Sequence, residues 1–317
     1  MVKSSLNPPS NRFEGIRLEK EEEKVEKKRW LMRGALLCLG ALIVMGACSR
    51  QSQQASSLQI KGSDTMVNLG QAWAEAFMKA NPEVSVAVTG GGSGTGIAAL
   101  LSNTCEIAEL SRELKPEEIA MAKQKGFDPK QITVALDGLA VIVHPANPVA
   151  QLTMDQLAAI FSGSVRNWKE VGGSDLPIVV LSREVNSGTH VYFKEHVLRR
   201  GSKESQAEFA ANALMLSSSQ AIADEVAQNP SAIGYFGMGY ISSKEKALAI
   251  ARDADSPYVR PTIENVVAKA YPISRPLLMV TRGQPQGLVA KFLNFVLGPE
   301  GQKIVARIDF VPVSSQQ

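Results

Sequence analysis

Residues 58–101 read LQIKGSDTMVNLGQAWAEAFMKANPEVSVAVTGGGSGTGIAALL and alternate between strand patterns and helix patterns. The short strand LQIKG leads into a segment in which Leu69, Trp73 and Phe77 recur at helical spacing. Asn-Pro ends that helix, VSVAVTG follows as a strand, and the glycine-rich run 90–96 opens the next helix. This alternation predicts an α/β protein whose mostly parallel sheet is flanked by helices.

The same alternation continues toward the C-terminus. Strand patterns follow at 132–145, 176–184, 231–237 and 275–283, and helix patterns at 153–163, 189–199 and 287–306. Thr153 is the expected N-cap of its helix. Ligands of parallel α/β sheets bind beyond the carboxyl ends of the strands, so binding residues are expected in strand-to-helix loops.

An apolar run at 34–47 lies behind Arg29 and Arg33. It is shorter than the ~20 residues that span a bilayer, and it fits the apolar region of an export signal. The small pair Gly46-Ala47 followed by Cys48 resembles the lipobox of bacterial lipoproteins, which implies cleavage before Cys48 and lipidation of its thiol. A signal-anchor helix with an incidental cysteine is the alternative.

The segment ahead of that run is unusually long for a signal and contains an acidic stretch at 21–23. Met32 would begin a more ordinary signal, so residues 1–31 are interpreted as the product of an upstream start codon. Residues 48–57 are polar and without periodicity, and they are predicted to be a flexible tether.

Charge and cysteine content exclude two classes of protein. Residues 1–47 hold 9 of the 34 Lys/Arg and 6 of the 31 Asp/Glu, so residues 48–317 hold 25 of each. The basic excess of the whole chain is therefore no evidence for nucleic-acid binding, which requires a basic surface. Beyond Cys48 only Cys105 remains, so no internal disulfide is available, and Cys105 is expected to be a buried apolar side chain.

Three loops between strands and helices share one design. Loop one is GSDTM at 62–66, loop two is GGGSGTG at 90–96, and loop three is REVNSGT at 183–189. Each places hydroxyls beside a helix N-terminus, where unpaired N–H groups and the helix dipole favour anions. A single loop of this kind is usually an N-cap, but three of them, one with Arg183 ahead of Ser187, favour an anion site.

A fourth element is Ser111-Arg112, which follows a strand-like segment and precedes a Pro-led helix. This position predicts Arg112 at a strand end as an anion ligand. A surface charge is the alternative, since most arginines are exposed.

Nucleotide binding is not favoured by loop two. A P-loop requires Lys-Ser/Thr after its last glycine, whereas Ile97 and Ala98 follow Gly96. Gly94, Gly96 and Ala99 fit a loose dinucleotide pattern, but no acidic residue ends a strand about 20 positions later.

A hydrolase that uses Ser93 or Ser187 is a different class of function. His190 and His196 lie six positions apart on one predicted helix, nearly opposite in azimuth and unlike paired ligands. Thr95 replaces the last glycine of a nucleophile elbow around Ser93. We therefore expect no catalysis, no cofactor and no metal. A scaffold protein with the same fold is a third possibility.

Strings spread from Ile60 to Val313 resemble the periplasmic phosphate-binding proteins that feed the high-affinity phosphate ABC transporter. They are GSDTM, GGGSGTGI, DGLAVIVHPANP, LTMDQLAAIFSGSVRNW, SREVNSGT, IGYFGMGY and YPISRPLLM. The resemblance implies a two-domain periplasmic-binding-protein fold of type II that closes around dehydrated phosphate. DGLAVIVHP and YPISRPLLM would be the hinge strands, with domain one at 58–139 plus 273–317 and domain two at 140–272.

Together with the loops, the resemblance gives a set of candidate phosphate ligands. They are Ser63, Asp64, Thr65, Met66, Ser93, Gly94, Thr95, Ser111, Arg112, Arg183, Ser187, Gly188 and Thr189. The implied partners are inorganic phosphate and an ABC permease. The protein is expected to be a monomer in the periplasm or on the outer face of the cytoplasmic membrane, in contact with that membrane only through the lipid at Cys48.

Two positions depart from part of the family. Some members have an Asp where Arg112 stands, and that Asp accepts the hydrogen of protonated phosphate; another branch has Arg. Val185 replaces an acid that is common in loop three.

A buried acceptor favours phosphate over sulfate, because sulfate would leave a buried charge unpaired. Asp64 is the candidate replacement acceptor, with an N-cap role for the helix at 67–80 as its alternative. A receptor for phosphonate, sulfate or molybdate is the alternative within this class.

Overall fold

The computed structural model describes residues 56–313. The predictions for the export signal, for Cys48 and for most of the tether lie outside these residues. The described residues belong to one compact unit. Within the described part of the chain, none of the helices has both the length and the apolar character needed to cross a membrane.

The described residues form strands β1 to β11 and helices α2 to α10. The strands are β1 Ser56–Gly62, β2 Val84–Thr89, β3 Ile107–Leu110, β4 Lys130–Val143, β5 Gln151–Thr153, β6 Val179–Arg183, β7 Leu214–Leu216, β8 Ala232–Gly237, β9 Lys246–Ala247, β10 Ala249–Ala251 and β11 Ser274–Thr281. The α-helices are α2 Val67–Ala80, α3 Ser93–Leu101, α4 Pro116–Gln124, α5 Met154–Phe161, α6 Gly188–Phe193, α7 Ser219–Gln228, α8 Ile263–Val267, α9 Gly287–Leu297 and α10 Pro299–Arg307. Short 3₁₀ turns are η1 Asp64–Met66, η2 Trp168–Val171 and η4 Met238–Tyr240, and η3 Lys194–Leu198 is a π-helix.

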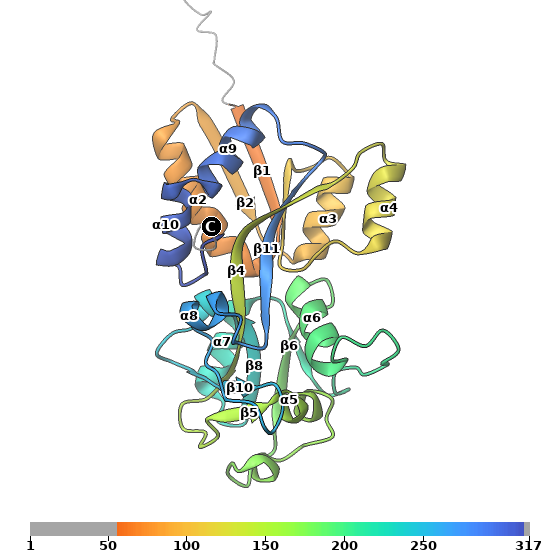
Figure 1. The fold of residues 1–317 in the computed structure, drawn as a ribbon, viewed down its shortest axis with the longest axis vertical. Helices are drawn as coiled ribbons and strands as arrows, with labels where there is room; N and C mark the ends of the chain where they lie inside the picture. The colour runs from red at the N-terminus through yellow and green to blue at the C-terminus, as the bar shows by residue number, and fades with distance from the viewer. Residues whose placement is uncertain (1–55, 314–317) are drawn as a thin grey trace, which may run out of the picture. The chain divides into compact units, whose positions relative to one another are not determined.

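The main sheet has the strand order β2-β1-β3-β11-β4-β8-β6-β7, with β9 paired to β4 (Figure 1). The pairs β1–β2, β1–β3, β6–β7 and β6–β8 are parallel, whereas β11 is antiparallel to β3 and β4, and β4 to β8. Helices cover both parts of the sheet in Figure 1. The predicted α/β class, with a mostly parallel sheet flanked by helices, is confirmed.

Strand β4 connects two halves of the sheet. Its first part pairs with β11 as far as Gly138, and its last five residues, from Leu139, pair with β8. We call β1, β2 and β3, with the helices beside them, the first half, and β6, β7 and β8, with theirs, the second half. The predicted domain boundaries stay a prediction. β1 begins at Ser56, so it includes the last two residues of the segment predicted as tether.

Local patterns explain most of these elements. Leu69, Trp73 and Phe77 form the buried face of α2, and the Trp73 indole N–H donates to the Gly301 carbonyl at 2.8 Å. Thr153 caps α5 as expected, accepting from the Gln156 N–H. The helix expected at 189–199 instead continues as the π-helix η3, and the one expected at 287–306 breaks at Gly298-Pro299.

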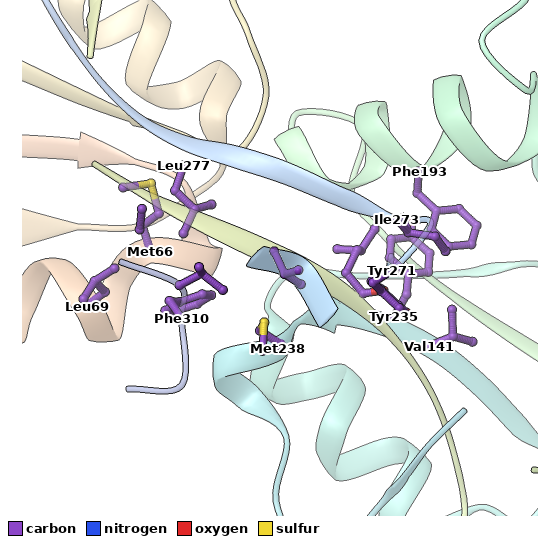
Figure 2. Close-up of a cluster of buried hydrophobic side chains, with 14 of the residues drawn as sticks. Met66, Leu69, Val141, Phe193, Tyr235, Met238, Tyr271, Ile273, Leu277 and Phe310 are labelled. Atoms are coloured by element: carbon purple, nitrogen blue, oxygen red, sulfur yellow. The ribbon is translucent and has the colours of Figure 1, made fainter. Parts of the chain in front are cut away.

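The largest apolar cluster continues across both halves of the sheet. Figure 2 shows part of it, from Leu69 and Phe310 near the first half to Phe193 and Tyr235 in the second. Burying one such large side chain stabilises the fold by about 1.5–3 kcal/mol. This core packs beneath the strand ends from which the three loops leave.

Candidate anion-binding site

Loops one, two and three all follow the carboxyl ends of strands, namely β1, β2 and β6. Gly62, at the start of loop one, has a φ of 146°, and a Cβ there would lie 2.1 Å from the Glu109 carbonyl oxygen. Only glycine therefore allows loop one to leave β1 so close to β3. β6 runs opposite to β1 and β2, so the three loops meet between the two halves of the sheet, each in the strand-to-helix position that the sequence predicted.

Loops one and three meet through a hydrogen bond between two hydroxyls. Thr65 Oγ1 and Thr189 Oγ1 are 2.8 Å apart, and both residues are buried. They stand 124 positions apart in the chain and come from opposite halves of the sheet. The structure thus brings together two residues that the sequence predicted to contact one anion.

Loops two and three are also in contact, with Ser111 between them. Ser93 Oγ accepts a hydrogen bond from the Ser111 N–H at 3.1 Å. A Cβ built on Gly188 would lie 2.2 Å from Ser93 Oγ and 2.7 Å from Ser111 Oγ, so the backbone of loop three approaches both hydroxyls closely. Ser187 is buried and caps α6 through the His190 N–H. We call Thr65, Ser93, Ser111, Ser187, Gly188 and Thr189 the loop cluster.

Arg183 lies at the end of β6 with 1% of its surface exposed. Its Nη1 lies 3.0 Å from Asp64 Oδ2 in an ion pair and donates to Ser219 Oγ, also at 3.0 Å. Nε donates to the Leu216 carbonyl at 3.3 Å, and Nη2 donates to the Ser217 carbonyl at 2.8 Å. Burial lowers the pKa of the Arg183 guanidinium, and the nearby Asp64 carboxylate opposes that fall. These contacts hold the cation in one orientation.

Asp64 joins the two halves of the sheet. Its Oδ2 also accepts from the N–H of Ser219, the first residue of α7, at 2.7 Å, and its carbonyl accepts from the Tyr240 hydroxyl at 2.8 Å. A carboxylate is stabilised at a helix N-terminus by the helix dipole. Neither η1 nor α2 has a side-chain cap hydrogen bond, so the alternative that Asp64 is an N-cap is wrong.

A second buried ion pair, which the sequence analysis missed, lies beside the loop cluster. Arg275 on β11 stands opposite Asp137 on β4, and both side chains are 0% exposed. Arg275 forks onto Asp137 Oδ2 from Nε at 2.9 Å and from Nη2 at 2.8 Å. Nη1 donates to the Ser111 carbonyl at 3.0 Å, and Nη2 lies 3.5 Å from Thr65 Oγ1. Burial raises the pKa of Asp137, and Arg275 opposes that rise.

The structure does not bring the Arg112 side chain into the loop cluster. Its guanidinium forks onto the Glu118 carboxylate at 2.8 and 2.7 Å and donates to the Glu113 carbonyl at 2.8 Å. Arg112 instead lines a groove of about 820 Å³ together with Tyr192 and Ser274. Glu118, six residues later, takes both ends of the fork, and the role of Arg112 as an anion ligand stays a prediction.

The four other candidates are Ser63, Met66, Gly94 and Thr95, and each makes a hydrogen bond that holds a loop in shape. The Met66 N–H donates to the Ser63 carbonyl at 3.0 Å, and the Met66 side chain is buried in the core. The Gly94 N–H donates to the Asn186 carbonyl at 2.9 Å. Thr95 Oγ1 donates to a carbonyl within loop two at 2.7 Å. These bonds shape the loops around the cluster.

Residues 56–313 contain no group of three or more His, Cys, Asp or Glu side chains arranged to hold a metal ion. His190 Nδ1 lies 3.2 Å from Ser182 Oγ, and burial lowers the pKa of His190 to about 4. His196 stacks on the Tyr192 ring at 3.8 Å. The two histidines therefore have separate packing partners.

Glu109 is a buried acid behind loop one. It is 0% exposed, and neither carboxyl oxygen has a hydrogen-bond partner among the described residues. Space for it comes from Gly70 of α2, where a Cβ would lie 2.5 Å from Glu109 Oε1. Burial raises the pKa of Glu109 well above its ordinary value of 4.5. The group is therefore protonated in the folded protein under conditions in which the unfolded chain would ionise it.

We expect Glu109→Gln to remove a pH dependence of stability. Between the unfolded pKa near 4.5 and the higher folded pKa, the native state binds more protons than the unfolded state. The free energy of unfolding of the natural protein should therefore fall as pH rises through this window, by up to about 1.4 kcal/mol per pH unit. Denaturant unfolding between pH 5 and pH 8 would measure it, with the exposed Glu117→Gln as the matched control. Parallel pH profiles for Glu109→Gln and the natural protein would contradict the expectation.

Comparison with known proteins shows which family the chain belongs to. A family model described as a PBP superfamily domain matches residues 49–300. The phosphate-binding protein PstS of Pseudomonas aeruginosa is 32% identical over 284 residues, which cover 84% of this chain and 86% of that protein. PstS of Bacillus subtilis is 31% identical over 271 residues, covering 84% of each.

Solved structures give the same result. A substrate-binding protein of a phosphate ABC transporter from Clostridium perfringens, crystallised with bound phosphate, is 37% identical with a TM-score of 0.73. The match covers 81% of this chain and 100% of that one. An ABC-type phosphate transport receptor from Vibrio cholerae is 30% identical with a TM-score of 0.64, over 81% of this chain and 100% of that one. The chain belongs to the PBP superfamily and, within it, to the family of the PstS phosphate-binding proteins.

Proposed function

We propose that this protein captures inorganic phosphate between loops one, two and three and delivers it to an ABC permease for import. The observation that carries the proposal is the loop cluster, in which hydroxyls from both halves of the sheet meet in a buried site. Arg183 and Arg275 lie beside it as buried cations. Phosphate requires this combination of fixed donors and positive charge. The Clostridium perfringens relative was solved with phosphate bound. No catalytic role is proposed.

The hinge of this protein is proposed to lie in β4 and β11. Both strands run between the two halves in Figure 1, and β4 changes its partner from β11 to β8 after Gly138. Domains at 58–139 plus 273–317 and at 140–272 would then rotate about these strands. The loop cluster, with residues from both sides, would form only on closure.

Asp64 is proposed as the acceptor that separates phosphate from sulfate. Its Oδ2 is held by Arg183 and Ser219, whereas Oδ1 accepts no hydrogen bond from another described residue. A carboxylate oxygen next to the site would accept the proton that phosphate keeps near neutral pH. Sulfate has no such proton, and its charge would face the carboxylate.

Titration calorimetry on protein dialysed free of phosphate tests the function. We expect sub-micromolar phosphate binding, about −8 kcal/mol or better, and sulfate binding roughly a hundredfold weaker. Asp64→Asn should narrow the difference between the two anions. Equal affinities in the natural protein would contradict the role of Asp64, and binding of neither anion would contradict the function.

The protein is proposed to work outside the cytoplasmic membrane, tethered by lipid at Cys48. The support is the lipobox-like Gly46-Ala47-Cys48 behind the apolar run at 34–47. Metabolic labelling with a radioactive fatty acid, with Cys48→Ala as the control, tests the anchor. Equal labelling of both proteins would contradict it.

A further inference from the structure

Asn186 connects loop three to loop two by three hydrogen bonds. Its carbonyl accepts from the Gly94 N–H at 2.9 Å. Its side-chain Nδ2 donates to the Gly91 carbonyl at 2.8 Å and lies 3.4 Å from Thr95 Oγ1. We call these three bonds the Asn186 contact. Since Asn186 belongs to the second half of the sheet and loop two to the first, the contact joins the two halves.

Loop two has the shape that receives Asn186. A Cβ on Gly92 would lie 2.8 Å from the Asn186 carbonyl oxygen, and one on Gly94 would lie 3.2 Å from it. Gly91 and Gly92 have φ values of 113° and 98°, which residues other than glycine rarely adopt. Side chains at these positions would therefore move the two loops apart. Much of the glycine content of loop two is explained by this contact between loops.

The Asn186 side chain donates its hydrogen bonds to loop two and not to a ligand. The group that faces the Gly91 carbonyl has to be a donor, which fixes the orientation of the Asn186 amide. That amide is directed to loop two, so it does not supply the anion with a donor. Asn186 is also exposed to solvent, so its side chain contributes little to the core. Its hydrogen bonds can form only when the two loops are together, so they stabilise that arrangement and no other.

We infer that Asn186 is an affinity-determining residue that holds the two halves closed over the anion without contacting it. This inference rests on the proposed function, because it takes the anion to lie between these loops. Capture takes place while the loops are apart, so the contact has no effect on association. Release requires the contact to break, so the contact slows dissociation.

Substitutions at Asn186 should change the dissociation rate constant of phosphate and leave the association rate constant unchanged. Asn186→Ala removes the bonds from Nδ2 and keeps the backbone bond, so the dissociation rate of phosphate should rise about three- to tenfold, with association unchanged within about twofold. Asn186→Asp should have the larger effect, because a carboxylate oxygen would face the Gly91 carbonyl. Val185→Ala is the matched control, since Val185 is the adjacent loop residue and is 74% exposed.

The experiment uses the protein as cells produce it. Rapid filtration with radiolabelled phosphate gives association, and a chase with unlabelled phosphate gives dissociation. A dissociation rate of Asn186→Ala equal to that of the control would overturn the inference, as would an equal loss in association. Hydrogen exchange at the Gly94 amide in phosphate-saturated protein gives a second result that does not depend on the rate measurements. Exchange should be faster in Asn186→Asp than in Val185→Ala, and equal rates would overturn the inference, whereas failure of the natural protein to bind phosphate would contradict the proposed function instead.

Discussion

Arg183→Met is expected to weaken phosphate binding by roughly 30- to 1,000-fold, or about 2 to 4 kcal/mol. The change removes a buried cation beside the loop cluster and leaves the Asp64 carboxylate without its ion-pair partner. It also removes the donors to the Leu216 and Ser217 carbonyls, which position β7 and the start of α7. Both effects weaken the site, one by removing charge and the other by loosening the second half of the sheet around it.

A double-mutant cycle with Asp64→Asn shows whether Arg183 acts on phosphate binding only by holding Asp64 or also directly on the anion. If Arg183 acts only by holding Asp64, each single variant should lose the same affinity and the double variant should lose no more. If Arg183 also stabilises the anion, Arg183→Met should cost distinctly more than Asp64→Asn. We expect the second result, measured by phosphate calorimetry with thermal unfolding as the check on folding. Unchanged affinity in Arg183→Met would remove this residue from the proposed site.

The fold could be predicted because its signals are local. Periodic apolar positions such as Leu69, Trp73 and Phe77 define the buried face of α2 within one segment. The Thr153 cap is likewise a short-range pattern. The carboxyl ends of β1 and β2 in the first half and of β6, which runs the other way, in the second half then bring loops one, two and three together. The meeting of Thr65, Ser93 and Gly188 follows from that topology.

The features that the sequence analysis missed depend on long-range register or on the choice of a side-chain partner. Arg275 and Asp137 stand 138 positions apart and pair only because β11 and β4 are antiparallel in one register. A charged residue inside each of two apolar runs was the available signal. Arg112 lies at the strand end where it was predicted, but its guanidinium pairs with Glu118 and not with the loop cluster. Which partner such a long side chain takes depends on the packing around it.

Arg275→Met is expected to destabilise the protein by roughly 3–5 kcal/mol. The substitution leaves the Asp137 carboxyl buried with only the Met238 N–H, 3.0 Å away, as a donor. Without the guanidinium, the pKa of Asp137 in the folded protein should rise above the value it has beside Arg275. The native variant would then bind a proton that the unfolded chain loses, so its stability should fall further as pH rises above about 4. Denaturant unfolding at pH 4.5 and pH 7.5 measures both effects, and an Arg275→Met variant as stable as the natural protein at pH 7.5 would contradict the prediction.

The double variant Arg275→Met, Asp137→Asn distinguishes a structural role from a role in binding. The amide introduced at position 137 would keep an acceptor for the Met238 N–H and would carry no charge, so most of the lost stability should return. Phosphate affinity should not return, because the cation beside Thr65 is still missing. Recovery of stability together with full affinity would make the ion pair a purely structural connection between β4 and β11. Recovery of stability without affinity would identify Arg275 as a second cation of the anion site. This follows from its position, since one guanidinium contacts Asp137 on β4, the Ser111 carbonyl and the Thr65 hydroxyl together.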